Sequence, residues 1–172
     1  MRISINAGHT IKGPGSGAIY KGFNESEINR EVVKILKTIL RQRGHSVHDS
    51  TVDSATTQNA YLRKVCERVN NSDAELFISL HCNASTLHTG HGVECYTWKG
   101  AKHAHASKIC ANLAKLGFRN RGIKDGRNLY VVKNTKPTAI LVELFFLDNY
   151  EDRKLYLEKG AEQIAAAIAK SI

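Results

Sequence analysis

Three side chains of this sequence could together bind a metal ion. His9 follows a short apolar run and Gly8, His81 ends the apolar run LFISLH, and Glu25 opens an amphipathic segment. Two imidazoles and one carboxylate, with water in the fourth position, form the ligand set of a catalytic zinc site. Their spacing alone does not establish such a site, because each residue has a plain structural alternative. His9 could be an exposed loop histidine, and His81 could be a core histidine bonded to a carbonyl. Glu25 could be a carboxylate favoured by the positive end of a helix dipole.

The choice of carboxylate depends on how the first long helix begins. Asn24 is a favoured N-cap, and Glu27 can reach back to it from three residues further on in a capping box. That arrangement accounts for Glu27 and leaves Glu25 free to act as a ligand. Glu27 nevertheless remains a rival ligand, because it lies only two residues after Glu25.

A catalytic carboxylate is suggested by Glu143, which lies within the apolar run AILVELFF. An ionised carboxylate on a buried strand costs several kcal/mol unless it is paired or lies close to a cation. An arginine partner is one explanation for its position. A carboxylate that accepts the proton of a metal-activated water explains it better, because such a group must lie in a pocket close to a cation.

Two further polar positions follow predicted strands and could contact a substrate. Asn83 lies two residues after His81, where it could orient a substrate or simply cap the strand. Residues 120–128 carry Arg121, Lys124 and Arg127, whose cations could bind carboxylates or form a solvated basic loop. We take Asn83 and Arg127 as the predicted substrate contacts.

The elements that must position these residues follow an α/β pattern. Runs with strand character alternate with segments whose apolar residues have helical spacing. An amphipathic helix is predicted over residues 25–43, and a broken helical stretch ends the chain. This order predicts a single domain with a twisted, mostly parallel sheet of about six strands, flanked by helices on both faces. Such sheets bind ligands where loops leave the carboxyl ends of strands. The predicted strands are RISINA, SVHD, LFISLHC, VECYTW, LYVVKN and ILVELFF.

Composition and charge restrict the partners. Of the 172 residues, 42% are hydrophobic and 24% are charged, which is typical of a globular protein. No apolar stretch reaches the roughly 18 residues of a membrane-spanning helix, so no membrane insertion is expected. The net charge of +9 favours a polyanionic partner, either nucleic acid or an anionic cell envelope. Nucleic acid is disfavoured, because the single tryptophan and most other aromatic residues belong to strand patterns.

The amino terminus and the cysteines bear on the compartment. The first residues, MRISINAGHT, lack the apolar core of a secretory signal, so synthesis in a cytoplasm is expected unless a leader has been removed. The four cysteines include no C-x-x-C pair, and each lies in an apolar segment. We expect all four to be reduced and to pack as small apolar residues.

Five motifs in order carry a family resemblance: NAGHT with GPGSGA, NESEIN, FISLHCNAS, RGIKDGRNLYVV and ILVELFFLDN. The whole chain, residues 1–172, resembles one catalytic domain of the zinc-dependent N-acetylmuramoyl-L-alanine amidases of bacterial cell-wall hydrolases and bacteriophage endolysins. The resemblance implies zinc bound by His9, Glu25 and His81, with Glu143 as the catalytic carboxylate. Cys82 stands where this family more often has a small residue such as alanine. Strand alternation directs its side chain away from the metal, so it is not expected to be a ligand.

The resemblance also implies a substrate and a place of action. The family cleaves the amide between the lactyl group of N-acetylmuramic acid and L-alanine in peptidoglycan, and this anionic polymer would attract a basic enzyme. A separate cell-wall-binding module is common in the group and is not visible in this chain. The absence of a signal suits an endolysin, which accumulates in the host cytoplasm before it acts at the cell wall. Alternative functions are another zinc hydrolase, such as a carboxypeptidase, and a non-catalytic wall-binding module.

Overall fold

The structure is a computed structural model that describes residues 1–172, and it contains one six-stranded sheet with helices on both faces. The strands lie in the order β4-β1-β5-β8-β6-β7. Neighbouring strands are parallel except β6 and β8, which are antiparallel. The predicted fold class is therefore confirmed. The sheet consists of β1 (Arg2–Ala7), β4 (Ser46–Asp49), β5 (Leu76–Asn83), β6 (Val93–Thr97), β7 (Asn120–Asp125) and β8 (Thr138–Phe146), and a small hairpin consists of β2 (Ile19–Tyr20) and β3 (Phe23–Asn24).

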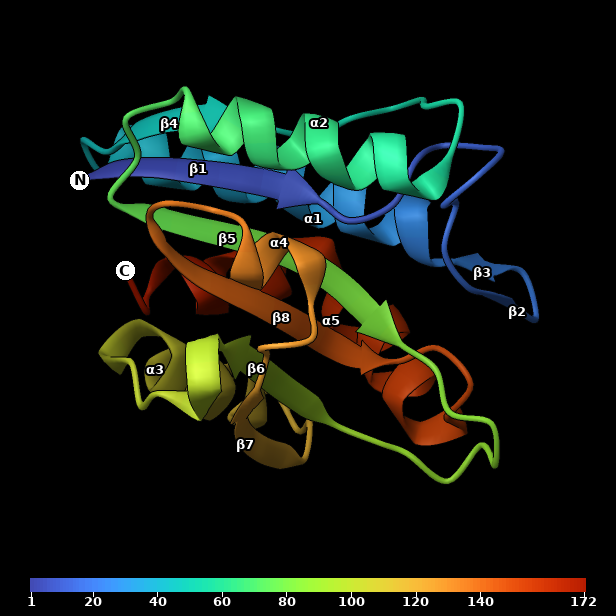
Figure 1. Cartoon of the computed structure of the whole chain (residues 1–172). Coiled ribbons are helices and arrows are strands. Elements are labelled where there is room, and N and C mark those ends of the chain that lie inside the picture. The colour runs from blue at the N-terminus through green and yellow to red at the C-terminus, as the bar shows by residue number, and fades with distance from the viewer.

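The helices form two layers around the sheet (Figure 1). The apolar faces of the long helices α1, α3 and α5 contribute to the larger core cluster, together with residues of β5 such as Ile78 and Leu80. The other face of β5 carries Phe77, which packs with α2 and α4 in a smaller cluster. None of the helices is both long and apolar enough to cross a membrane. The helices are α1 (Glu25–Gln42), α2 (Gln58–Asn70), α3 (Ala104–Ala114), α4 (Tyr130–Lys133) and α5 (Tyr150–Ala169), and a 3₁₀ turn covers Trp98–Gly100.

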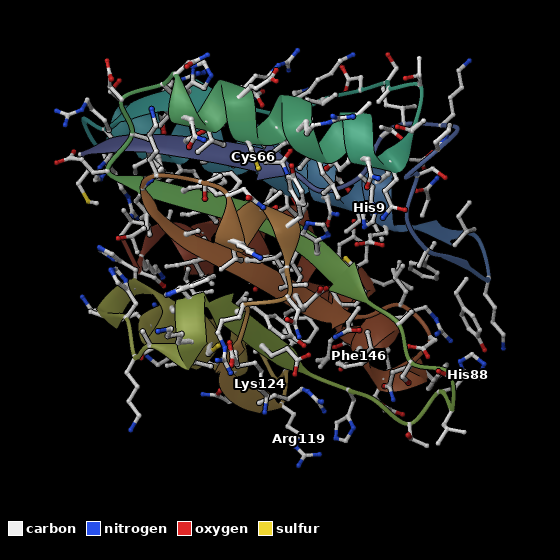
Figure 2. The ribbon with its side chains drawn as sticks, viewed as in Figure 1. His9, Cys66, His88, Arg119, Lys124 and Phe146 are labelled. Carbon is white, nitrogen blue, oxygen red and sulfur yellow. The ribbon has the colours of Figure 1, made fainter.

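Strand direction determines which residues meet at one edge of the sheet. The carboxyl ends of β1, β5 and β8 lie at the same edge, because these strands run parallel to one another. The antiparallel pairing of β6 with β8 brings the amino end of β6, and with it that of β7, to this edge. His9 and Phe146 mark it near the ends of β1 and β8 (Figure 2). Four functional candidates lie at or near this edge: His9 follows β1, His81 and Asn83 lie near the end of β5, and Glu143 lies near the end of β8.

Two segments between residues 120 and 134 differ from the sequence prediction. The run LYVVKN, predicted as a strand, contains the short helix α4, whose Val131 and Val132 pack in the smaller cluster. The segment predicted as a basic loop contains β7, which is the edge strand of the sheet. An edge strand needs few buried residues, and in β7 only Ile123 packs against the larger core. The apolar alternation that signals a strand is therefore absent from its sequence.

The long helices test three expectations from the sequence: the N-cap at Asn24, the capping box at Glu27 and the break in the final helix. The side chain of Asn24 accepts a hydrogen bond from the Ser26 N–H, which confirms the predicted N-cap. Glu27 is exposed, and its side chain makes no capping-box hydrogen bond. In α5, Gly160 has φ +69°, which interrupts the helix and confirms the predicted broken stretch.

All four cysteines are buried and free of disulfides, as predicted.

Candidate metal centre

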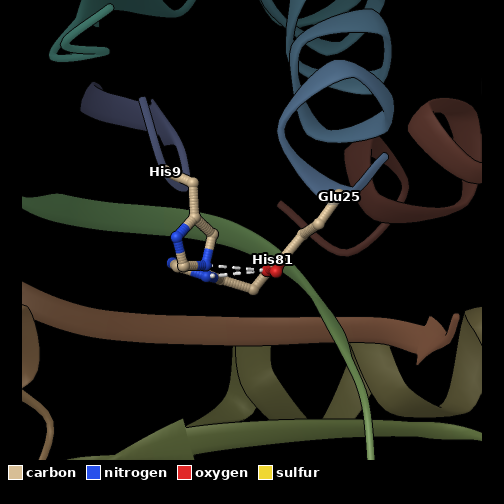
Figure 3. A group of neighbouring side chains, drawn as sticks. All are labelled: His9, Glu25 and His81. Carbon is tan, nitrogen blue, oxygen red and sulfur yellow. Dashed lines mark hydrogen bonds and ion pairs between the residues drawn. The ribbon is translucent and has the colours of Figure 1, made fainter. Parts of the chain in front are cut away.

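Three predicted ligands converge at the loop edge of the sheet. One ligand atom from each of His9, Glu25 and His81 lies within 4.8 Å of the others. His9 follows β1, Glu25 is the first residue of α1, and His81 lies near the end of β5 (Figure 3). The Nε2 of His9 lies 3.0 Å from Oε1 of Glu25, and the Nδ1 of His81 lies 3.3 Å from the same oxygen. The fold therefore brings together His81 and Glu25, which are 56 positions apart in the sequence.

His9 is held in an unusual backbone conformation. Its φ is +70°, in the left-handed region that a residue with a side chain rarely adopts. Its N–H donates to the hydroxyl of Tyr61 over 2.7 Å, and its carbonyl accepts from Nη2 of Arg30 over 2.9 Å. The ring Nδ1 donates to the carbonyl of Gly15 over 2.9 Å, which directs Nε2 toward the cluster. These contacts stabilise a strained position that orients the ligand.

The other histidine is oriented by a chain of polar side chains inside the sheet. The Nε2 of His81 lies 3.1 Å from Oγ of Ser79, which in turn accepts from Nδ2 of Asn6 over 3.0 Å. Asn6 and Ser79 are fully buried. With Nε2 occupied in this way, Nδ1 is the nitrogen that faces Glu25. Metal-binding histidines commonly show this pattern, in which one nitrogen binds a neighbouring polar group and leaves the other free.

Glu25 is buried and accepts hydrogen bonds from the main chain. Its Oε1 accepts from the Cys82 N–H over 3.1 Å, and its Oε2 accepts from the Ala18 N–H over 3.0 Å. Burial alone would raise the pKa of Glu25, but hydrogen bonds and charges from His81 and His9 outweigh it and hold the pKa far below its usual range. The carboxylate is therefore ionised. Two imidazoles and one ionised carboxylate fit zinc as a donor set.

The predicted catalytic carboxylate lies beside this cluster. Glu143 on β8 is the direct strand partner of His81 on β5. Its Oε2 is buried without a hydrogen-bond partner. Burial, and then the charges of Glu25 and Glu94, raise the pKa of Glu143 well above its ordinary value. His9, His81 and Glu143 line one cleft of about 340 Å³, whose apolar wall comes from α2, α4 and β8.

A second buried carboxylate beside Glu143 was not found by the sequence analysis. Glu94 on β6 is the antiparallel partner of Glu143, and only 3% of its surface is exposed. It accepts hydrogen bonds from Asn83, Tyr96 and Arg121. The available signal was a lone carboxylate in the apolar run VECYT, the same kind of pattern that identified Glu143.

The two predicted substrate contacts lie in different surroundings. The Nδ2 of Asn83 donates to Oε1 of Glu94 over 2.9 Å, next to Glu143. Arg127 is exposed, and its Nη2 lies 2.7 Å from Oδ2 of Asp125. It does not line the cleft, although its neighbour Asn128 does. A role in substrate binding remains a prediction for both.

A glycine next to the cluster gives a first testable prediction. Gly17 has φ +82°, and a Cβ there would lie 2.8 Å from Oε2 of Glu25 and 2.8 Å from Cγ of His9. Gly13 has φ +84°, but a Cβ there would contact nothing within 4 Å. Both alanine substitutions are expected to cost about 1–2 kcal/mol in backbone strain. Only Gly17→Ala should also weaken zinc binding, by about 10-fold or more, since it displaces two ligands.

Zinc affinity by competition with a chromogenic chelator, together with thermal unfolding, checks this prediction. Gly13→Ala serves as the control, because it has the same backbone strain without the contacts. Equal zinc affinity in the two variants would show that Gly17 does not support the ligands.

The fold and the site together define a class of protein. Two histidines and a glutamate beside a buried carboxylate, at the loop edge of an open α/β sheet, form a group that could hold a metal ion and serve a hydrolase. Family comparison makes the assignment specific. The chain belongs to the N-acetylmuramoyl-L-alanine amidase family (Amidase_3), whose match covers residues 3–172.

Individual relatives agree with this assignment. The chain is 30% identical over 175 residues to N-acetylmuramoyl-L-alanine amidase LytC of Bacillus subtilis, covering 94% of this chain and 34% of LytC. It is 32% identical over 181 residues to the endolysin of Bacillus phage SPP1, covering 96% of this chain and 64% of the endolysin. The chain spans about a third to a half of the length of the first relatives that it matches.

Solved structures show the same fold. The catalytic domain of CD27L endolysin targeting Clostridia difficile matches with a TM-score of 0.90 and 33% identity, over 99% of this chain and 96% of that chain. The catalytic domain of CwlV, an N-acetylmuramoyl-L-alanine amidase from Bacillus (Paenibacillus) polymyxa var. colistinus, matches with a TM-score of 0.84 and 27% identity. That match covers 99% of this chain and 94% of the CwlV domain.

Proposed function

We propose that this chain is the catalytic domain of a zinc-dependent N-acetylmuramoyl-L-alanine amidase. It hydrolyses the amide between the lactyl group of N-acetylmuramic acid and L-alanine in bacterial peptidoglycan. The observation that carries the proposal is the convergence of His9, Glu25 and His81 beside Glu143, in a chain of this family.

The residues of the site have distinct roles in this reaction. Zinc held by His9, Glu25 and His81 supplies Lewis-acid chemistry, which acidifies water and polarises the scissile carbonyl. With a cation bound at the neighbouring cluster, the ionised form of Glu143 would be favoured, and it would accept a proton as the oxygen of water bonds to the lactyl carbonyl carbon. It then delivers a proton to the alanine nitrogen as the C–N bond breaks. The free oxygen of Glu143 and its position next to His81 support this role.

Removal of the metal gives the direct test of this function. Purified peptidoglycan is digested with the protein, and new end groups are measured with and without a chelator. We expect new amino-terminal L-alanine, its loss with chelator, and its return when zinc is added. New reducing sugar ends, or amino termini other than alanine, would assign the site to a different bond. Activity that survives complete zinc removal would contradict the metal role.

The surface charge and the length of the relatives support the proposed partners. A net charge of +9 favours attraction to the anionic cell wall, where we propose that the protein acts. Since the chain spans only part of its first relatives, a separate cell-wall-binding module is also part of the proposal. Asn83 and Arg127 are its proposed substrate contacts.

A further inference from the structure

A row of polar side chains crosses the sheet beside the metal cluster. His81 on β5 pairs with Glu143 on β8, and Glu143 pairs with Glu94 on β6. The row ends on the edge strand β7, where Nε of Arg121 donates to Oε2 of Glu94 over 2.7 Å. Since neighbouring strands lie about 4.8 Å apart, the backbone of Arg121 stands roughly 10 Å from that of Glu143, on the side away from His81.

The guanidinium of Arg121 is fixed on one side and open on the other. Its Cζ lies 4.9 Å from the ring centre of Phe146, and its Nε is bonded to Glu94. Glu94 is itself held by Asn83 and Tyr96, each over 2.9 Å. The two terminal nitrogens of Arg121 donate to no protein group, and 28% of the side chain is exposed. The terminal N–H groups are therefore available to a ligand, and their planar geometry matches the two oxygens of a carboxylate.

We propose that Arg121 binds a carboxylate on the peptide side of the substrate, carried by the residue that follows L-alanine. This inference rests on the proposed amidase function. The scissile nitrogen must lie within hydrogen-bond reach of Glu143 in order to receive its proton. Two extended residues span about 7 Å beyond that nitrogen. A carboxylate on the second residue therefore covers most of the roughly 10 Å between the backbones of Glu143 and Arg121. The Arg121 side chain, which reaches back to Glu94 on the intervening strand, spans the rest.

The neighbouring cations are less suited to this role. The guanidinium of Arg127 is engaged by Asp125 through both Nε and Nη2. Lys124 (Figure 2) belongs to β7, as Arg121 does, but it is exposed and its flexible ammonium donates from a single point. Stability alone does not account for the pair of Arg121 and Glu94. A buried ion pair is often no more stabilising than apolar residues of the same size.

A matched pair of substrates separates recognition from structure. The first is N-acetylmuramoyl-L-alanyl-D-glutamate extended by the rest of a stem peptide, with a free α-carboxylate on the second residue. The second is identical except that this carboxylate is a carboxamide. KM and kcat are measured for the zinc-loaded wild type and for Arg121→Gln, Arg127→Gln and Lys124→Gln. Calorimetry then measures the Kd of each substrate in the inactive Glu143→Gln background, with and without Arg121→Gln.

The inference predicts an effect that depends on both partners. Arg121→Gln should raise KM and Kd for the carboxylate substrate by about 10- to 100-fold, the scale of a lost charge-assisted hydrogen bond. It should leave kcat, and the values for the carboxamide substrate, within about 2-fold of wild type. Lys124→Gln should behave as wild type toward both substrates, and Arg127→Gln should preserve the discrimination between them.

Three results would overturn the inference. Equal losses on both substrates would show that Arg121 acts only through the structure of the sheet. If Arg127→Gln, and not Arg121→Gln, abolished the preference for the carboxylate substrate over the carboxamide, the carboxylate would be assigned to Arg127. Failure of the wild type to release amino-terminal alanine from either substrate would reject the amidase itself, and this inference with it.

Discussion

Replacement of Glu143 by glutamine is expected to lower the release of amino-terminal L-alanine by about 1,000-fold, while the protein keeps its zinc. The rate falls because the amide can neither accept the proton of the attacking water nor deliver one to the departing nitrogen. Zinc stays because Glu143 is not among the three groups that face one another in the cluster. The amide of glutamine has the same shape as the carboxylate that it replaces. In addition, Oε2 of Glu143 makes no hydrogen bond that the substitution would remove.

Three measurements on the same preparation check this expectation. They are initial rates of end-group release, zinc content by atomic emission, and thermal unfolding. The unfolding temperature should match or exceed that of the wild type, because the substitution removes a buried ionisable group with a strongly raised pKa. A variant that keeps more than a tenth of the activity would remove Glu143 from the mechanism. A variant that loses its zinc would make Glu143 a ligand.

Replacement of Glu25 by glutamine is expected to weaken zinc binding by more than about 100-fold and to abolish activity with it. The loss should exceed the 10- to 100-fold that removal of an outer-shell partner costs, because a charged ligand itself is removed. Glu25 contacts both histidines through Oε1, and only 4% of its surface is exposed. Zinc affinity by competition with a chelator of known strength measures the effect.

The matched control lies two residues further along α1. Glu27→Gln makes the same chemical change within the first turn of α1, where Glu27 points into solvent. We expect this variant to bind zinc and cleave peptidoglycan as the wild type does. Zinc affinity that depends on Glu27, and not on Glu25, would reverse the ligand assignment.

Local patterns in the sequence were sufficient for most of the fold. Apolar spacing predicted α1 almost to its observed end at Gln42, and alternation in LFISLH placed Phe77 and Ile78 on opposite faces of β5. These patterns succeed because they record which side of an element is buried. They failed for β7 and α4. An edge strand buries too little to show the pattern, and four helical residues are too few to override the strand propensity of Val131 and Val132.

The sequence also pointed to the candidate reactive groups, and the family resemblance assigned their expected roles. Each candidate stood out by its place in the sequence. The two histidines, His9 and His81, come at or just after the end of an apolar strand, Glu143 lies within one, and Glu25 lies in the first turn of a helix. Whether Glu25 or Glu27 faces the histidines could not be decided locally, because both suit the helix amino terminus. The structure decides it, since Glu25 is directed inward to the Cys82 N–H while Glu27 is exposed.

The sequence by itself determined which residue types were available for metal binding and proton transfer, and that strand ends would carry them. Only the tertiary structure decided which of them meet. The antiparallel placement of β6 puts Glu94 opposite Glu143, and β7 then brings Arg121 to the same edge. Strand order and direction depend on contacts between distant segments. No window of the sequence contains those contacts, so the row from His81 to Arg121 appears only in the folded chain.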